Sequence, residues 1–167
     1  MKNIVLIGMP GAGKSTVGVL LAKSLLMNFT DTDLIIQRET KSALCDIINE
    51  RGTGYFIALE EEIILRQDFS LSVIATGGSV VYGERAMERL KANGTAVYLK
   101  TALPRLISRL GDITTRGIAM DKGTDIPSLY RERAPLYEKY ADITIDCTEL
   151  SPEECVNLIV EEIGKLK

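Results

Sequence analysis

The segment from Ile4 to Ser15 constrains the fold more than any other part of the sequence. It consists of a short apolar run, Ile4-Val-Leu-Ile7, followed by Gly8-Met-Pro-Gly-Ala-Gly-Lys-Ser15. A compact, largely β-branched run that ends in glycine is typical of a buried parallel strand. The second part matches the phosphate-loop pattern of a glycine, four residues and then Gly-Lys-Ser or Gly-Lys-Thr. The segment therefore predicts an α/β protein that binds a nucleoside triphosphate.

Each part of this loop has a physical role in holding phosphate. Glycines let successive backbone N–H groups turn toward the phosphate oxygens. The following helix, which apolar spacing predicts from Lys14 to Met27, directs its positive N-terminal end at the same anion. The lysine reaches the β- and γ-phosphates, and the serine hydroxyl ligates Mg²⁺. The expected nucleotide-binding residues are Gly11, Ala12, Gly13, Lys14, Ser15 and Thr16.

A phosphate loop does not say what is done with the nucleotide, so kinase, ATPase and GTPase functions all remain open at this point. The chain has no Asn/Thr-Lys-x-Asp motif of the kind that GTPases use to read the base. The strand candidate Val73–Thr76 ends in threonine and glycine, where many ATPases carry a magnesium-supporting aspartate. The carboxylates that support the metal must therefore lie elsewhere.

Composition limits the kinds of binding partner and the residue types available for catalysis. The chain has 167 residues, a net charge of -3 and a pI near 5.2, which argue for one domain and against a basic nucleic-acid-binding face. It has no histidine, so acid–base chemistry must use carboxylates, lysine or tyrosine. Its three cysteines lack CxxC spacing, which makes a zinc site unfavourable and suits the reducing cytoplasm. No apolar stretch is long enough to span a membrane.

Strand and helix patterns alternate along the rest of the chain. Further strands are expected at Val73–Thr76, Thr95–Leu99 and Ile143–Ile145, with helices between them. Ser151, Pro152 and Glu154 form a capping box at the start of a last helix. This alternation predicts a parallel sheet covered by helices on both faces. For the whole chain, residues 1–167, we expect a single domain with a three-layer α/β/α fold around a five-stranded parallel sheet. The glycine-rich stretch 111–125 is interpreted as a mobile lid rather than an inert loop.

The chain resembles the shikimate kinase family, which consists of P-loop kinases, over about 130 residues. The matching motifs come in order along the sequence: the phosphate loop, the paired aspartates Asp31 and Asp33, the stretch from Gly52 to Phe56, the glycines Gly77-Gly78, the arginines Arg109 and Arg116, and Arg133 in Tyr-Arg-Glu-Arg-Ala-Pro-Leu-Tyr137.

The resemblance implies a role for each of these positions. Asp31, with Ser15, would hold Mg²⁺, and Asp33 would orient the acceptor hydroxyl. Lys14 and Arg116 would neutralise charge on the transferring phosphoryl group, which is the main task in phosphoryl transfer. Arg109 and Arg116 would bind ATP, whereas Asp33, Gly77, Gly78 and Arg133 would bind the acceptor. The implied protein is a cytoplasmic monomer that phosphorylates shikimate for aromatic amino-acid biosynthesis and binds neither nucleic acid nor membrane.

The departures from the family pattern fall mainly on the acceptor side. Ile57 stands where the family has an arginine that pairs with the substrate carboxylate, and Ser79 stands in place of a third glycine. Gly117 follows Arg116 where the family has proline, and Leu150 occupies a position that often holds an arginine packed on adenine. A charge-assisted hydrogen bond contributes roughly 1.5–3 kcal/mol, which is about 10- to 150-fold in affinity.

Several hypotheses remain open because of the missing arginine. The first is that Arg51 or Arg66 replaces the missing arginine, and the second is that shikimate binds weakly. The third is that the acceptor is another small hydroxy acid or polyol. Two further alternatives are a regulatory module that binds ATP without catalysis and an ATPase that acts on a protein partner. Retention of Lys14, Asp33 and Arg116 favours a kinase over the regulatory module.

Overall fold

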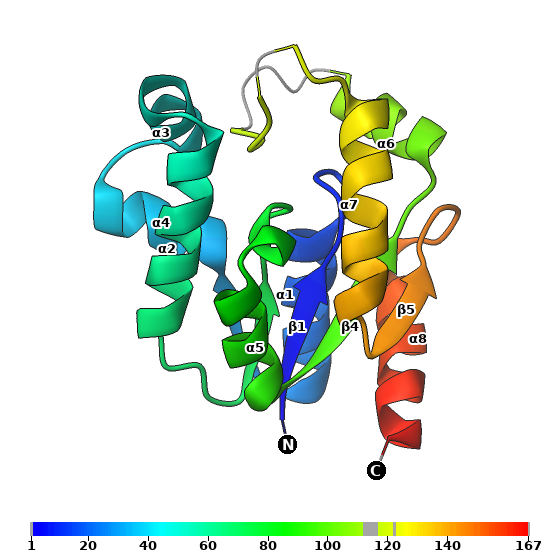
Figure 1. Ribbon diagram of the computed structural model, residues 1–167. Coiled ribbons are helices and arrows are strands. Elements are labelled where there is room, and N and C mark those ends of the chain that lie inside the picture. Colours follow the sequence, from blue (N-terminus) through cyan, green and yellow to red (C-terminus); the bar gives the residue numbers. More distant parts are fainter. Residues whose placement is uncertain (1, 112–116, 122, 167) are drawn as a thin grey trace.

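The computed structural model describes residues 2–111, 117–121 and 123–166 (Figure 1). Within this part of the chain, five strands form one parallel sheet in the order β2-β3-β1-β4-β5. The strands are β1 (Asn3–Ile7), β2 (Asn28–Asp31), β3 (Ser72–Ala75), β4 (Gly94–Lys100) and β5 (Ile143–Asp146). The helices are α1 (Lys14–Leu25), α2 (Thr32–Thr40), α3 (Leu44–Arg51), α4 (Thr53–Arg66), α5 (Glu84–Ala92), α6 (Leu103–Leu110), α7 (Ile126–Tyr140) and α8 (Pro152–Lys165), with a short 3₁₀ turn, η1 (Val80–Tyr82).

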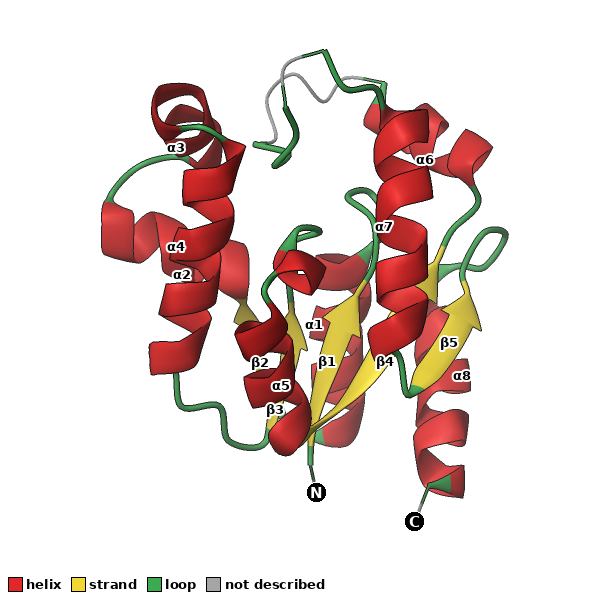
Figure 2. Ribbon diagram, in the orientation of Figure 1, coloured by secondary structure: helices red, strands yellow, loops and turns green. Residues whose placement is uncertain are grey.

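The helices cover both faces of this sheet. Figure 2 shows α5 and α7 across the front face and α1 and α8 behind it, while α2, α3 and α4 extend beyond the β2 edge. The predicted three-layer α/β/α fold is therefore confirmed. No helix in the described ranges is both long enough and apolar enough to cross a membrane.

The central strand is buried along its whole length. All five residues of β1 are buried, because β3 and β4 flank it and helices cover both its faces. Leu6 pairs with Ala75 on one side and with Val97 on the other. A strand surrounded in this way needs apolar side chains on both faces, which explains the continuous run in the sequence.

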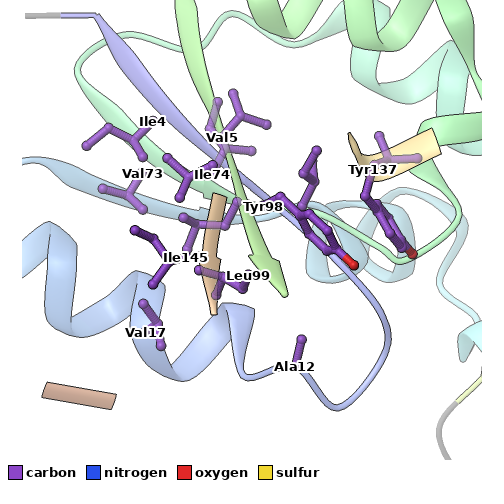
Figure 3. Packing of buried hydrophobic residues seen from close by; sticks show 14 of the residues in the cluster. Ile4, Val5, Ala12, Val17, Val73, Ile74, Tyr98, Leu99, Tyr137 and Ile145 are labelled. Carbon is purple, nitrogen blue, oxygen red and sulfur yellow. The ribbon is translucent and has the colours of Figure 1, made fainter. Parts of the chain in front are cut away.

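One large hydrophobic cluster joins the sheet to its covering helices. Figure 3 shows Val17 of α1 packed beneath the sheet residues, with Tyr98 of β4 beside Tyr137 of α7. The two tyrosine rings stack with their centroids 5.1 Å apart. This contact fixes α7 on the sheet and so places the functional side chains that α7 carries.

The predicted elements differ from the observed ones mainly at their ends. The first helix was predicted to reach Met27 but ends at Leu25, because Leu26 adopts a left-handed conformation with φ 55°. Strand β2 was not predicted, since Asn28–Asp31 is a partly exposed edge strand with polar residues. The predicted capping box of α8 is present, with Ser151 and Glu154 each accepting a hydrogen bond from the other's backbone N–H.

Candidate active site

The site forms where the parallel strands end. The phosphate loop follows β1, Asp31 ends β2, and Gly77 and Gly78 follow β3. Carboxyl ends of parallel strands meet at one edge of a sheet, which is where α/β proteins bind ligands. Segments far apart in the sequence are brought together at this edge.

The phosphate loop has the backbone that its glycines allow. Gly13 has φ 94°, a left-handed conformation that ends the loop immediately before α1. A side chain at Gly8 would lie 2.8 Å from the carbonyl oxygen of Leu99, so the loop also passes too close to β4 for any Cβ there. The Nζ of Lys14 donates to the carbonyl oxygens of Gly8 (2.8 Å) and Met9 (2.9 Å). The lysine is thus held over the loop.

The two residues predicted to hold the metal contact each other. The hydroxyl of Ser15 donates to Oδ2 of Asp31 at 2.7 Å, and Oδ1 of Asp31 accepts from the backbone N–H of Asp33 at 3.0 Å. The second contact makes Asp31 the N-cap of α2, which fixes its orientation. A hydroxyl and a carboxylate are hard oxygen ligands of the type that Mg²⁺ prefers.

Lys14 and Asp33 have shifted pKa values. The pKa of Asp33 is raised to about 6, mainly by burial and also by the charge of Asp31, while Lys14 opposes the shift. Burial lowers the pKa of Lys14 to about 8, while Asp33 opposes that change. Two groups of opposite charge in an enclosed site, with pKa values on either side of neutrality, are a common mark of an active site.

The turn after β3 is held by side chains from three other elements. The N–H of Gly77 donates to Oγ1 of Thr32 at 3.2 Å, and the hydroxyl of Tyr137 donates to the carbonyl of Gly78 at 2.6 Å. The hydroxyl of Ser79 donates to Oε2 of Glu60 at 2.6 Å. A Cβ on Gly77 would lie 2.5 Å from Oε1 of Glu60 and 2.9 Å from a carboxylate oxygen of Asp33, so a side chain there would displace these carboxyl groups.

Arg133 is a second buried cation of the site, besides Lys14. It is 1% exposed, and its Nε donates to the hydroxyl of Tyr82 at 3.2 Å. The guanidinium lies over the Tyr82 ring at 5.2 Å, and Nη2 donates to the carbonyl of Ala119. Nη1 lies 3.0 Å from the position of a Cβ on Gly78. Arg133 thus joins the glycine turn to the chain around Ala119.

These elements enclose a cavity of about 800 Å³. The phosphate-loop end is lined by Gly11–Thr16 together with Arg109, Leu110, Cys147, Leu150 and Cys155. The other end is lined by Asp33, Gln37, Phe56, Gly77, Gly78 and Arg133. Nη1 of Arg109 donates to the carbonyl of Gly11 at 3.2 Å, which attaches α6 to the loop.

The structure gathers most of the predicted site residues around this cavity. The six loop residues, Asp33, Gly77, Gly78, Arg109 and Arg133 line it, and Asp31 adjoins it through Ser15. Arg116, together with the rest of 112–116, lies outside the described residues.

Neither arginine considered as a replacement at the acceptor end lines the cavity. Arg51 lies over the Tyr55 ring at 5.1 Å, and Arg66 pairs with Glu62 at 3.4 Å. Among the described residues, Arg109 and Arg133 are the arginines that line the cavity.

Three residues near this end were not predicted from the sequence. Gln37 lies four residues after Asp33 on α2, so both side chains share one helix face and line the cavity. Glu60 and Tyr137 reach the glycine turn from α4 and α7. The helical spacing from Asp33 could have identified Gln37, whereas the other two depend on contacts between distant segments.

Comparisons with known proteins agree with this geometry. The model of one protein family, shikimate kinase, matches residues 10–164. The chain belongs to the shikimate kinase family. The shikimate kinase of Thermodesulfovibrio yellowstonii is 40% identical over 169 residues, which cover 99% of this chain and 97% of the relative. That of Persephonella marina is 37% identical over 98% of this chain and 99% of the relative.

Solved structures of the shikimate kinase family give the same result. The shikimate kinase from Acinetobacter baumannii, solved in complex with shikimate, matches with a TM-score of 0.92 at 29% identity. That match covers 100% of this chain and 95% of the other. The Aquifex aeolicus shikimate kinase matches with a TM-score of 0.83 at 34% identity, over 97% of this chain and 96% of the other. The chain therefore has shikimate kinase activity, which is ATP-dependent phosphotransfer to an alcohol group.

Proposed function

We propose that the protein transfers the γ-phosphoryl group of ATP to a hydroxyl of shikimate with the help of Mg²⁺. The observation that carries the proposal is that one cavity is lined by Lys14 and Ser15 of the phosphate loop and by Asp33, the Gly77–Gly78 turn and Arg133, while Asp31 adjoins it through Ser15. The shikimate complex of the Acinetobacter baumannii enzyme supports the choice of acceptor.

Each described residue has a role that follows from its chemistry. Ser15 and Asp31 offer hard oxygen ligands for Mg²⁺. When bound, Mg²⁺ would neutralise phosphate charge and align the phosphates. Lys14 balances the charge that develops on the transferring group. Asp33 accepts the hydrogen bond of the attacking hydroxyl and orients it, with its pKa of about 6 keeping most of it ionised at neutral pH.

The acceptor binds at the glycine turn. Gly77 and Gly78 line the cavity next to Asp33, and Arg133 supplies a buried positive charge beside Gly78. A carboxylate on the acceptor would pair with that charge, which belongs to the one of the two acceptor arginines of the family pattern that this chain keeps. Arg109 and Arg116 complete the ATP side, the first through its contact with the phosphate loop.

The stretch 111–125 is proposed to act as a lid over this site. Gly117, Ile118 and Ala119 line the cavity, and a Cβ on Gly117 would lie 2.6 Å from the Cβ of Leu44, so this part packs closely against α3. Such a cover keeps water away from the phosphoryl group. Residues 112–116 and 122 of the stretch lie outside the described part of the chain.

For the cell compartment and the oligomeric state, we keep the expectation drawn from the sequence. We expect a cytoplasmic monomer, and the free thiols of Cys45, Cys147 and Cys155 support a reducing compartment.

A coupled ADP-release assay with Mg·ATP tests the proposal. Shikimate should stimulate turnover strongly over buffer, and a panel of small hydroxy acids and polyols should not. Turnover with another acceptor alone would assign a different substrate. ATP binding with no turnover on the whole panel would indicate a regulatory module, and ATP hydrolysis stimulated by a protein partner would indicate an ATPase.

A further inference from the structure

Glu60 is a buried carboxyl group near the acceptor end of the cavity. It is 1% exposed, and its Oε2 accepts a hydrogen bond from the Ser79 hydroxyl at 2.6 Å. Its Oε1 is buried and has no hydrogen-bond partner in the part of the chain that the structure describes. A buried carboxyl group is costly unless donors or cations compensate it. The Ser79 hydroxyl is therefore an important contact for Glu60.

Two departures from the family pattern meet at this carboxyl group. Ile57 precedes Glu60 by three residues on α4, so the two side chains are neighbours on one face of the helix. An arginine at position 57 would be within reach of Glu60, but isoleucine offers neither charge nor donor. Ser79, which stands in place of the third glycine, supplies the hydroxyl that contacts Glu60.

The Glu60 carboxyl group also supports the turn after β3, which carries Gly77 and Gly78. Its Oε1 lies 2.5 Å from the position of a Cβ on Gly77, so the carboxyl group packs directly against that glycine. Thr32 and Tyr137 hold the same turn at Gly77 N–H and at the Gly78 carbonyl. The Ser79–Glu60 hydrogen bond is thus a third attachment of the turn, and it comes from a different helix.

We propose that Ser79 and Glu60 form a positioning pair, in which the serine hydroxyl keeps the carboxyl group against Gly77 and so replaces support that an arginine at position 57 would give. Its kinetic consequence rests on the proposed function, because the acceptor that the turn positions is shikimate. Neither residue is assigned direct contact with the reacting atoms.

The charges around Glu60 fit this role. Its pKa is raised to about 7, mainly by burial, while the Ser79 hydrogen bond acts to lower the pKa and Asp33 acts to raise it. Arg133 and Lys14 lower it as well, from α7 and α1. The two cations serve the acceptor and the phosphates, so they do not replace a donor dedicated to Glu60. The Ser79 hydroxyl is such a donor.

A double-mutant cycle tests the pair. The variants are Ser79→Ala, Ser79→Gly, Ile57→Arg and the double variant Ile57→Arg/Ser79→Gly, with Ser72→Ala as the control. Ser72 is a buried serine at the start of β3, and its hydroxyl donates to the carbonyl of Ser70. Steady-state kinetics with shikimate and ATP, and urea unfolding, are measured for every variant.

The expected result is specific to the acceptor. Ser79→Ala and Ser79→Gly should each raise the KM for shikimate about 10-fold, as for loss of a hydrogen bond to a charged group. The KM for ATP should not change in these variants. The control Ser72→Ala should have the wild-type KM for shikimate and the wild-type KM for ATP. The effect of Ser79→Gly should shrink at least about threefold when Ile57 is also replaced by arginine, because the Ser79 hydroxyl and the introduced guanidinium would share Glu60 as a partner.

Two results would overturn the inference. One is a wild-type KM for shikimate in Ser79→Ala. The other is an equal effect of Ser79→Gly in both backgrounds, in kinetics and in unfolding. If wild-type protein does not turn over shikimate, the proposed acceptor is wrong, and the unfolding cycle still decides about the pair. In that case, the inference is overturned if Ser79→Gly lowers the free energy of unfolding equally in the wild type and in Ile57→Arg. It is supported if the loss is smaller in Ile57→Arg.

Discussion

The hydroxyl of Tyr137 donates a hydrogen bond to the backbone carbonyl of Gly78 at 2.6 Å. Tyr137 is fully buried on α7 and stacks on Tyr98 of β4. The acceptor-side turn is therefore fixed through α7 to the centre of the sheet. The same helix carries Arg133, one turn earlier, so the turn and its neighbouring cation share one rigid support.

Replacing Tyr137 by phenylalanine tests this support. The change keeps the ring and its stacking but leaves the Gly78 carbonyl without its donor, which should lower the free energy of unfolding by about 1 kcal/mol. The KM for shikimate should rise several-fold while the KM for ATP stays unchanged. Urea unfolding and steady-state kinetics measure both effects. Equal increases in the two KM values would show that the hydroxyl supports the whole site rather than the turn.

Asp33→Asn should separate nucleotide binding from transfer. The amide keeps the size of the side chain but is a weaker acceptor for the hydroxyl of the substrate, so kcat should fall about 10²- to 10⁴-fold. ATP affinity, measured by calorimetry, should remain within a few-fold of wild type because the loop residues are unchanged. Retention of near-wild-type turnover would show that Asp33 does not orient the acceptor.

The pH dependence of kcat/KM should be bell-shaped. Asp33 acts as a carboxylate with a pKa of about 6, so activity should fall as pH drops below that value. Lys14 acts as a cation with a pKa of about 8, so activity should also fall as pH rises above that value. A pH series between 5 and 9.5 with Mg·ATP and shikimate both below their KM values, so that the free enzyme is reported, and with a pH-insensitive detection of ADP, measures both limbs. A flat profile up to pH 9.5 would contradict the lowered pKa of Lys14.

Ile57→Arg should tighten shikimate binding if the acceptor end is otherwise of the family type. The added guanidinium would contribute roughly 1.5–3 kcal/mol to a contact with a carboxylate, so affinity should rise about 10-fold or more. Ile57→Lys is a useful comparison, since lysine carries the charge without the bidentate geometry. No change in either variant would show that the acceptor end has been rebuilt around a different contact.

Glu60 should make the stability of the fold depend on pH. Its folded-state pKa is about 7 against an ordinary value of 4.5, so its contribution is fully present below pH 4.5 and is lost as pH rises through 7. Glu60→Gln removes this titration. The unfolding free energy of wild type relative to Glu60→Gln should therefore fall between pH 5 and pH 8. Urea unfolding at several pH values measures the difference, and a constant difference would contradict the raised pKa.

The fold and the nucleotide end could be read from local sequence, whereas the acceptor end could not. A phosphate loop needs its glycines, lysine and serine in one short segment, and the strand before it is buried on both faces, so both signals are local. Asp31 and Asp33 required the family resemblance, because β2 is too short and polar to stand out as a strand.

Glu60 shows why the rest was missed. In the sequence it belongs to Glu60-Glu61-Glu62, which has the appearance of a solvent-facing helix surface. Only the packing of α4 against the turn after β3 buries the first of these glutamates and brings it to Ser79. The partners of Arg133 likewise come from η1 and from Ala119, segments that no local pattern connects.

Arg133 has one further consequence. The Arg133 guanidinium lies beside Gly78 and also donates to the carbonyl of Ala119. The proposed acceptor and the segment at Ala119 would therefore both use this guanidinium. Ligands linked through a common group change each other's equilibria reciprocally. With the acceptor paired to Arg133 as proposed, shikimate binding and the hydrogen bond from Arg133 to Ala119 would each change the free energy of the other.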